Sequence, residues 1–259
     1  MTKAFGFLKN LTLIALICLW LGPNPAAATN PLHEPDELLK SPTLDLGHAL
    51  YALDLYKDIL AQARPPQAPI LTRLTRTCFL IGELTVPSQK HKYYEKGQTY
   101  AEMLLKEQPT RVEGPYWLAM HLCGLADTGG ARQGRKLLPK IMKDLERAQS
   151  IDETYDQAGC HRVLGRIYFE APAWPFSVGD LQKSLKHLNR AVKLAPDNST
   201  NHLYLAETLI RLDQRQQARR ELERVLKCSH HALSPKGLED DRKQAKKLLE
   251  AVKDTPEDN

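Results

Sequence analysis

A large apolar residue followed directly by a small one recurs along the chain, and this repetition constrains the fold more than any other feature. Two helices can approach closely only where a side chain is short, so each such pair marks a helix that packs tightly against a partner. Each pair is followed by a second apolar helical pattern, usually closed by a proline. The pairs are Ile81–Gly82, Leu118–Ala119, Leu164–Gly165 and Leu205–Ala206.

The spacing of these pairs is longer than an ideal helical repeat. It is 37, 46 and 41 residues, against about 34 in a regular helix–turn–helix repeat. We therefore expect additional residues between the two helices of the first three units: about three in the first, ten in the second and seven in the third.

Both ends of the repeat array carry a predicted capping helix. The segment Asp45–Ala63 has one apolar face and must end before Pro65. At the other end, Ser234 is suited to the N-cap and Pro235 to the first helical turn. Because no segment alternates with period two, the sequence predicts an all-α fold, an α-solenoid of four irregular helix pairs with N- and C-terminal capping helices.

The predicted domain organisation follows from these limits. The helical repeat domain is expected at residues 45–253, preceded by a flexible N-terminal segment at 29–44 and followed by a disordered tail at 254–259.

The chain resembles the tetratricopeptide-repeat family, most strongly over Val112–Leu226. The resemblance is carried by Tyr116-Trp117-Leu118-Ala119, Leu164-Gly165-Arg166-Ile167-Tyr168 and 188–196, which reads LNRAVKLAP. Membership would imply a right-handed stack of helix pairs with a concave binding surface.

A narrower likeness links the chain to the periplasmic T component of tripartite ATP-independent (TRAP) transporters. It rests on Tyr116–Ala119, Leu145–Asp152, the loop Ala171–Asp180 and Leu185–Leu194. That resemblance implies a helical-repeat subunit that associates with a solute-binding partner and offers an apolar cavity.

The first 28 residues have the order of a secretory signal peptide. Lys3 and Lys9 precede an apolar run from Leu11 to Leu21, and small residues end at Ala28. We expect cleavage after Ala28 and a location in the periplasm or outside the cell, with retention as an anchor as the alternative. No later apolar stretch approaches the roughly 20 residues that span a bilayer, so the mature chain is not expected to cross a membrane.

Charge and motifs argue against several function classes. Loss of Lys3 and Lys9 lowers the net charge from +5 to +3, which is too small to indicate nucleic-acid binding. A glycine-rich phosphate loop, a paired-histidine metal motif and a nucleophile with its base are all missing from the sequence. We therefore expect no catalytic residues, no metal and no cofactor.

The cysteines of the mature chain are expected to be mainly free thiols. Cys123 and Cys160 fall late and early on parallel helices, about six rises of 1.5 Å apart or more, whereas a disulfide tolerates about 7 Å between Cα atoms. Cys228, His230 and His231 cluster after the fourth unit, where a solvated turn is favoured over a zinc site.

Helix geometry predicts which residues of the first helices face the concave groove. These are the residues two before, two after and five after the large member of each pair. The predicted groove residues are Phe79, Glu83, Val86, Tyr116, Met120, Cys123, Arg162, Arg166, Phe169, Leu203, Glu207 and Ile210.

Arg162 and Arg166 lie four residues apart and therefore share one face of a helix. Two guanidinium groups on one face could hold a carboxylate or a peptide C-terminus. The alternative, which the usual fate of semi-buried arginines favours, is an internal ion pair with Glu83, Glu113 or Glu207.

The loop Ala171–Gly179 carries Trp174 and Phe176 between two prolines and a glycine. An exposed apolar loop of this kind would be a contact surface. The favoured interpretation is that Trp174 is buried beneath the loop, because large aromatic side chains are usually buried.

Two functions fit these features. The first is an exported scaffold that recognises a protein or peptide partner in its concave groove. The alternative is a periplasmic accessory subunit of a TRAP-type solute transporter with an apolar ligand cavity and a solute-binding protein as partner. A cavity large enough for a small molecule would favour the second, whereas an open polar groove would favour the first.

Overall fold

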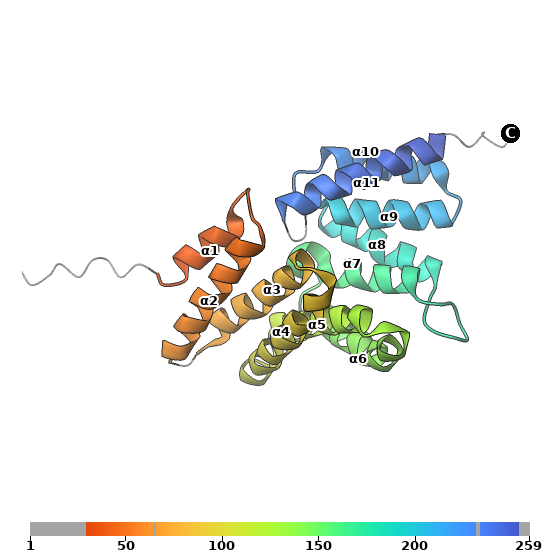
Figure 1. The fold of residues 1–259 in the computed structure, drawn as a ribbon. Coiled ribbons are helices and arrows are strands. Elements are labelled where there is room, and N and C mark those ends of the chain that lie inside the picture. Colours follow the sequence, from red (N-terminus) through yellow and green to blue (C-terminus); the bar gives the residue numbers. More distant parts are fainter. Residues whose placement is uncertain (1–29, 65, 232–233, 254–259) are drawn as a thin grey trace, which may run out of the picture. The chain divides into compact units, whose positions relative to one another are not determined.

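The computed structural model describes residues 30–64, 66–231 and 234–253, and over these residues it contains eleven α-helices and no strand. The described residues from Leu32 onward belong to one compact unit (Figure 1). The predicted signal peptide, its cleavage site and the tail at 254–259 lie outside the described residues. The helices are α1 (His33–Lys40), α2 (Leu46–Gln62), α3 (Ala68–Leu84), α4 (Pro87–Glu107), α5 (Glu113–Thr128), α6 (Gly130–Ile151), α7 (Tyr155–Glu170), α8 (Leu181–Leu194), α9 (Ser199–Arg211), α10 (Arg215–Lys227) and α11 (Pro235–Lys253).

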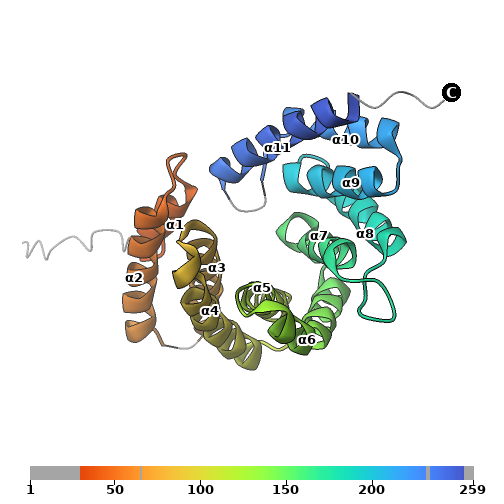
Figure 2. The ribbon, with the colours of Figure 1, turned by 45° about the vertical axis from the view of Figure 1, so that its right-hand side comes forward.

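Helices pack in consecutive pairs, α3 with α4, α5 with α6, α7 with α8 and α9 with α10, and neighbouring pairs touch along the chain (Figure 2). The four large–small pairs of the sequence lie in α3, α5, α7 and α9, the first helix of each pair. The prediction of an α-solenoid of four irregular helix pairs is confirmed.

The two glycines of these motifs lie where a side chain cannot fit. A Cβ atom added to Gly82 would lie 2.4 Å from Cε1 of Tyr94 on α4. At Gly165 it would lie 2.5 Å from Cγ of Leu188 on α8. Close approach of the two helices in a pair therefore requires glycine at these positions.

The two predicted capping helices are present, and at the second one Ser234 has the predicted N-cap role. Asp45 begins α2, and its Oδ1 accepts a hydrogen bond from the backbone N–H of His48 at 2.9 Å. Ser234 precedes α11, and its Oγ accepts from the backbone N–H of Gly237 at 3.1 Å. Each cap satisfies a backbone donor that would otherwise have no partner.

The prediction that the segment 29–44 is flexible is wrong for residues 33–40, which form α1. Asp36 holds this helix in place, because its carboxylate accepts from Tyr56 on α2 at 2.5 Å and from Nε of Arg73 on α3 at 2.7 Å. A helix this short is marginal by itself. Its stability comes from tertiary contacts that the local sequence does not show.

The additional residues of the first two units were also misplaced by the sequence prediction. Only Thr85 and Val86 separate α3 from α4, and only Gly129 separates α5 from α6. The extra residues lengthen the second helices to 21 and 22 residues. Gly130, at φ +74°, permits the tight turn before α6. In the third unit the extra residues do form a loop, at 171–180.

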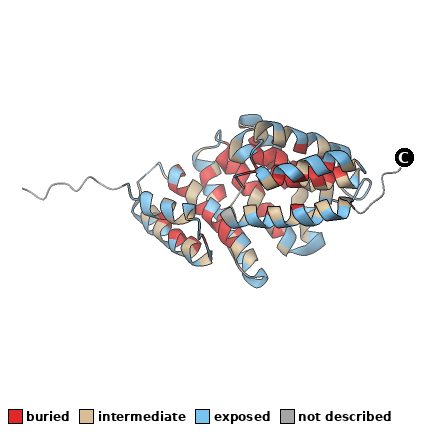
Figure 3. Ribbon diagram, turned by 90° about the horizontal axis from the view of Figure 1, so that it is seen from above, coloured by how far each residue is buried: buried red, intermediate tan, exposed pale blue. Residues whose placement is uncertain are grey.

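Buried residues lie mainly where neighbouring helices meet (Figure 3). The largest is Trp117 on α5, only 1% exposed, whose Nε1–H donates to the hydroxyl of Tyr155 at 3.0 Å. Around it pack Phe79 of α3 and Tyr116 of α5. None of the described helices is long and apolar enough to cross a bilayer.

Candidate functional site

A cavity of about 1040 Å³ opens among α3, α5, α6, α7 and α9, beside the loop after α7. Its wall is mostly apolar, with arginines and carboxylates spread over it. The apolar lining comprises Phe79, Met120, Cys123, Ala126, Ala131, Leu138, Ile141, Val163, Ile167, Ala171, Pro172 and Phe176. The polar lining includes Glu83, Asp127, Arg135, Asp156, Arg162, Arg166, Glu170, Ser177, Thr200, Tyr204 and His231.

Part of the predicted groove surface lies in this wall. The predicted residues that line the cavity are Phe79, Glu83, Met120, Cys123, Arg162, Arg166 and, from the loop, Phe176. All of them except Phe176 lie on α3, α5 and α7, the first helices of three successive pairs. Residues three or four apart on a helix share one face, so each of these helices contributes two residues to the wall.

The remaining predicted groove residues lie outside the lining: Val86, Tyr116, Phe169, Leu203, Glu207 and Ile210. Tyr116 is fully buried beside the next pair, where a Cβ on Gly159 would lie 2.4 Å from its hydroxyl. Leu203 is buried against Leu222 and Ala245, because α10 and α11 cover that face of α9. Neighbouring helices thus occupy positions that an ideal repeat would leave open.

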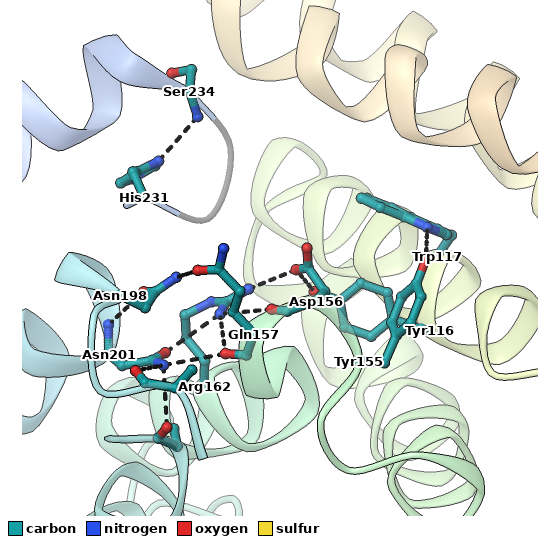
Figure 4. A network of polar contacts seen from close by, with 12 residues as sticks. Tyr116, Trp117, Tyr155, Asp156, Gln157, Arg162, Asn198, Asn201, His231 and Ser234 are labelled. Carbon is teal, nitrogen blue, oxygen red and sulfur yellow. Dashed lines mark hydrogen bonds and ion pairs between the residues drawn. The ribbon is translucent and has the colours of Figure 1, made fainter. Parts of the chain in front are cut away.

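Arg162 is buried, only 4% exposed, and is committed to contacts within the fold. Its Nη2 donates to Oδ2 of Asp156 at 2.7 Å, and its Nη1 donates to the carbonyl oxygens of Asp156 and Gln157 at 3.2 Å each (Figure 4). Asp156 was not among the predicted partners, because the left-handed turn at 156–158 that brings its carboxylate to Arg162 has no sequence signature.

Arg166 is likewise paired inside the fold. It forms ion pairs with Glu170 on its own helix and with Glu207 on α9. Its guanidinium carbon lies 4.6 Å from the ring centre of Tyr204 and 5.0 Å from that of Phe169. The pair with Glu207 is one of the internal alternatives considered from sequence.

The start of α7 carries an unusual backbone turn. Asp156, Gln157 and Ala158 have φ values of 51°, 55° and 64°, the left-handed region, which costs about 1–2 kcal/mol for each residue other than glycine. Side chains hold the turn: Asn201 Nδ2 donates to the Gln157 carbonyl at 3.2 Å, and Asn198 Nδ2 donates to the Gln157 side chain. Backbone strain of this kind is concentrated at binding and switch regions in proteins.

The favoured interpretation of the loop, with Trp174 buried beneath it, is wrong. Trp174 is 84% exposed and Phe176 83% exposed. The loop is closed by its own backbone, since Gly179 N–H donates to the Pro172 carbonyl at 2.9 Å. The loop thus presents both aromatic side chains on the surface.

Sequence reasoning missed the contribution of α6 to the wall. Ala131, Gly134, Arg135, Leu138 and Ile141 all line the cavity, although α6 is the second helix of its pair. The rule that only first helices face the groove holds for ideal repeats. The available signal was the great length of the second unit.

The wall has little reactive chemistry. Burial raises the pKa of the Cys123 thiol to about 12, so the thiol is protonated at neutral pH. Burial also raises the pKa of Tyr204. All four cysteines of the described chain are free thiols. The arrangement is suited to binding an apolar group.

The cluster at Cys228–His231 does not gather as a metal site. Cys228 is buried, whereas His230 is exposed and its Nδ1 lies 2.6 Å from Oδ2 of Asp197. Within the described ranges, no group of three or more His, Cys, Asp or Glu side chains could hold a metal ion.

Comparisons with known proteins bear on the family and on the fold. A family described as the TRAP transporter T-component matches residues 73–255. The solved structure of a thermophilic tetratricopeptide-repeat protein from Thermus thermophilus is similar, with a TM-score of 0.62 at 20% identity, covering 85% of this chain and 97% of that one. That likeness supports the fold alone. No curated protein matches the sequence.

Proposed function

Because the chain belongs to the T-component family of TRAP transporters, we propose that it is the accessory binding subunit of such a transport system and holds a ligand with an apolar body. The observation that carries the proposal is the cavity of about 1040 Å³. Small-molecule sites commonly enclose about 300–1,000 Å³, with mostly apolar walls and a few polar groups. The cavity has that size and that character.

The chemistry of the wall favours apolar recognition over capture of a carboxylate. Arg162 and Arg166 both have carboxylate partners within the fold. A ligand that displaced either partner would leave a charge without compensation, at a cost of several kcal/mol. Binding would come mainly from burial of apolar surface, at about 25 cal/mol per Å².

Partner and location follow the same proposal. The chain would work outside the cytoplasm, after export by its N-terminal segment, and would exchange ligand with a solute-binding protein. Its role would be binding, since the side chains that line the cavity include no nucleophile activated by a base.

Filling the cavity tests this function directly. Met120 lines the cavity, whereas Met103 on α4 lies on the surface. We expect Met120→Trp to weaken binding of an uncharged apolar fluorophore, N-phenyl-1-naphthylamine, at least tenfold in a fluorescence titration, and Met103→Trp to leave it unchanged. Equal binding by both variants, or none by the unmodified chain, would contradict the proposal.

A second candidate function is recognition of a protein or peptide through the solenoid surface. The observation in its favour is the exposure of Trp174 and Phe176 on one short loop, since aromatic side chains supply much of the binding energy at protein interfaces. If this candidate is right, a Trp174→Ala variant, which leaves the cavity lining intact, loses its affinity for a purified periplasmic solute-binding protein in calorimetry, and Met120→Trp keeps it. The opposite pattern would leave only the ligand cavity.

A further inference from the structure

Two histidines face each other on the side of α7 that points away from the cavity. Nδ1 of His161 on α7 lies 3.1 Å from Nδ1 of His187 on α8. A second hollow, of about 680 Å³, lies beside them between α6, α7 and α8. The proposed transport role makes no use of this pair.

The proton positions on His161 are determined by its other neighbour. Its Nε2 lies 3.2 Å from Oε2 of Glu153, and Glu153 also forms an ion pair with Arg190. The ion pair with Arg190 keeps Glu153 a carboxylate, which can only accept a hydrogen bond. His161 therefore carries its proton on Nε2 and presents a lone pair at Nδ1.

We propose that His161 and His187 form a binding site for a divalent transition-metal ion, represented by Zn²⁺, with both Nδ1 atoms as ligands. Zinc–imidazole bonds are about 2.0–2.1 Å long, and two such bonds span 3.1 Å at an angle of roughly 100°, close to tetrahedral. The hydrogen bond from His161 Nε2–H to Glu153 is the outer contact that metal-binding histidines usually make.

The hollow accounts for the other coordination positions. It adjoins both rings and lets water reach the ion, and Glu146 on α6 also lines it. The site thus has two protein ligands and open positions, which makes it weaker than a closed structural zinc site.

Charges around the pair determine which ions it can select. Lys186 and Lys193 line the hollow and disfavour any cation, whereas Arg190 is neutralised by Glu153. Only an ion with a strong preference for imidazole overcomes that repulsion, so Zn²⁺, Ni²⁺ and Cu²⁺ qualify and Mg²⁺ does not.

The two rings share one proton between their Nδ1 atoms, which lie in a 3.1 Å hydrogen bond. Because His161 accepts at Nδ1, His187 donates from Nδ1 in the metal-free chain. His187 therefore binds a metal ion in the tautomer that carries its proton on Nε2.

Calorimetry on tag-free protein, with ZnCl₂ as the probe and MgCl₂ as the control ion, tests the site. We expect one Zn²⁺ per chain, no heat with MgCl₂, and at least tenfold weaker zinc binding in His161→Gln and in His187→Gln. His230→Gln is the matched control, because His230 lies in the cluster after α10. Unchanged binding in the first two variants, loss in the control, or no zinc binding by the unmodified chain would overturn the proposal.

A measurement on the unmodified folded chain covers the case in which a variant unfolds. In nuclear magnetic resonance spectra of ¹⁵N-histidine-labelled protein, Zn²⁺ should shift the Nδ1 signals of two histidines and leave the others in place. Those two should be the signals of His161 and His187, assigned by through-bond correlation spectra of the unmodified chain. Shifts at other histidines would refute the site. The fluorophore titration of the cavity is independent of this result.

Discussion

Arg162 donates a 2.7 Å hydrogen bond from Nη2 to Oδ2 of Asp156, the first residue of a left-handed turn at the start of α7. The same carboxylate oxygen accepts from the hydroxyl of Tyr116 at 2.5 Å. One buried charge thus holds together a strained turn, its own helix and the preceding helix pair. The turn persists because its alternative would leave the Arg162 guanidinium buried without a carboxylate.

Removal of that carboxylate should destabilise the fold strongly. Asp156→Ala leaves the buried guanidinium uncompensated, at a cost of about 3 kcal/mol in the free energy of unfolding. Urea unfolding followed by circular dichroism measures the change. Asp54→Ala is the matched control, since Asp54 pairs with Lys57 on the surface of α2 and exposed pairs contribute about 0–1 kcal/mol. Similar losses in both variants would mean that Arg162 does not depend on Asp156.

Asp213 allows a test of backbone strain, because two substitutions there should change the free energy of unfolding in opposite directions. It lies between α9 and α10 at φ 59°, exposed, with only a surface ion pair to Arg215. Asp213→Gly should raise the free energy of unfolding by about 0.5 kcal/mol, because glycine adopts this conformation without a steric penalty. Asp213→Ala should lower it by about 1 kcal/mol. In thermal unfolding, the melting temperature of Asp213→Gly should lie above that of the unmodified chain and that of Asp213→Ala below it. A shift in the same direction for both variants would contradict backbone strain at Asp213.

The helix pairs were predictable because their signal is local. Gly82 and Gly165 leave room for a partner helix, and the spacing of Leu118–Ala119 from its neighbours repeats the same motif. The packing of α1 was not predictable, because it depends on Arg73, a residue far along the chain that contacts Asp36.

The cavity wall was predictable only in part, for the same reason. Helical phase alone places Met120 and Arg166 on the face that lines the cavity. Arg135 was missed, because it lies on α6, the second helix of its pair. Only Gly129 separates α6 from α5, and this short connection brings α6 to the cavity. Leu203 was wrongly assigned to the groove, because the capping helix α11 covers it. Contact with an element far along the chain cannot be recognised from the residues around Leu203.

A buried histidine should make stability fall in mild acid. His121 on α5 is fully buried against Thr75, and burial lowers its pKa from 6.5 to about 4. Between these values the unfolded chain binds a proton that the folded chain does not, so stability is complete above pH 6.5 and declines as the pH falls toward 4. The loss is of order 3 kcal/mol over that window.

The measurement is the urea midpoint at several pH values from about 7.5 to about 4.5, in a chelating buffer. His121→Gln should be less stable at neutral pH but should show a shallower decline with acid. His33→Gln, which changes an exposed histidine on α1, should keep the full decline. An unchanged slope in His121→Gln would show that another group titrates in this window.

Replacement by alanine should lower the free energy of unfolding strongly at the tryptophan of α5 and hardly at all at the tryptophan of the loop after α7. Trp117 is 1% exposed and donates to Tyr155, whereas Trp174 is 84% exposed. Trp117→Ala removes a fully buried side chain and should cost about 3–5 kcal/mol, and Trp174→Ala should stay within about 0.5 kcal/mol. Urea unfolding gives both values, and iodide should quench Trp174 emission in the folded chain. A large loss of stability in Trp174→Ala would mean that the indole packs against the protein in solution. The loop could then no longer serve as a contact surface, and the protein-recognition candidate would lose the observation that favours it.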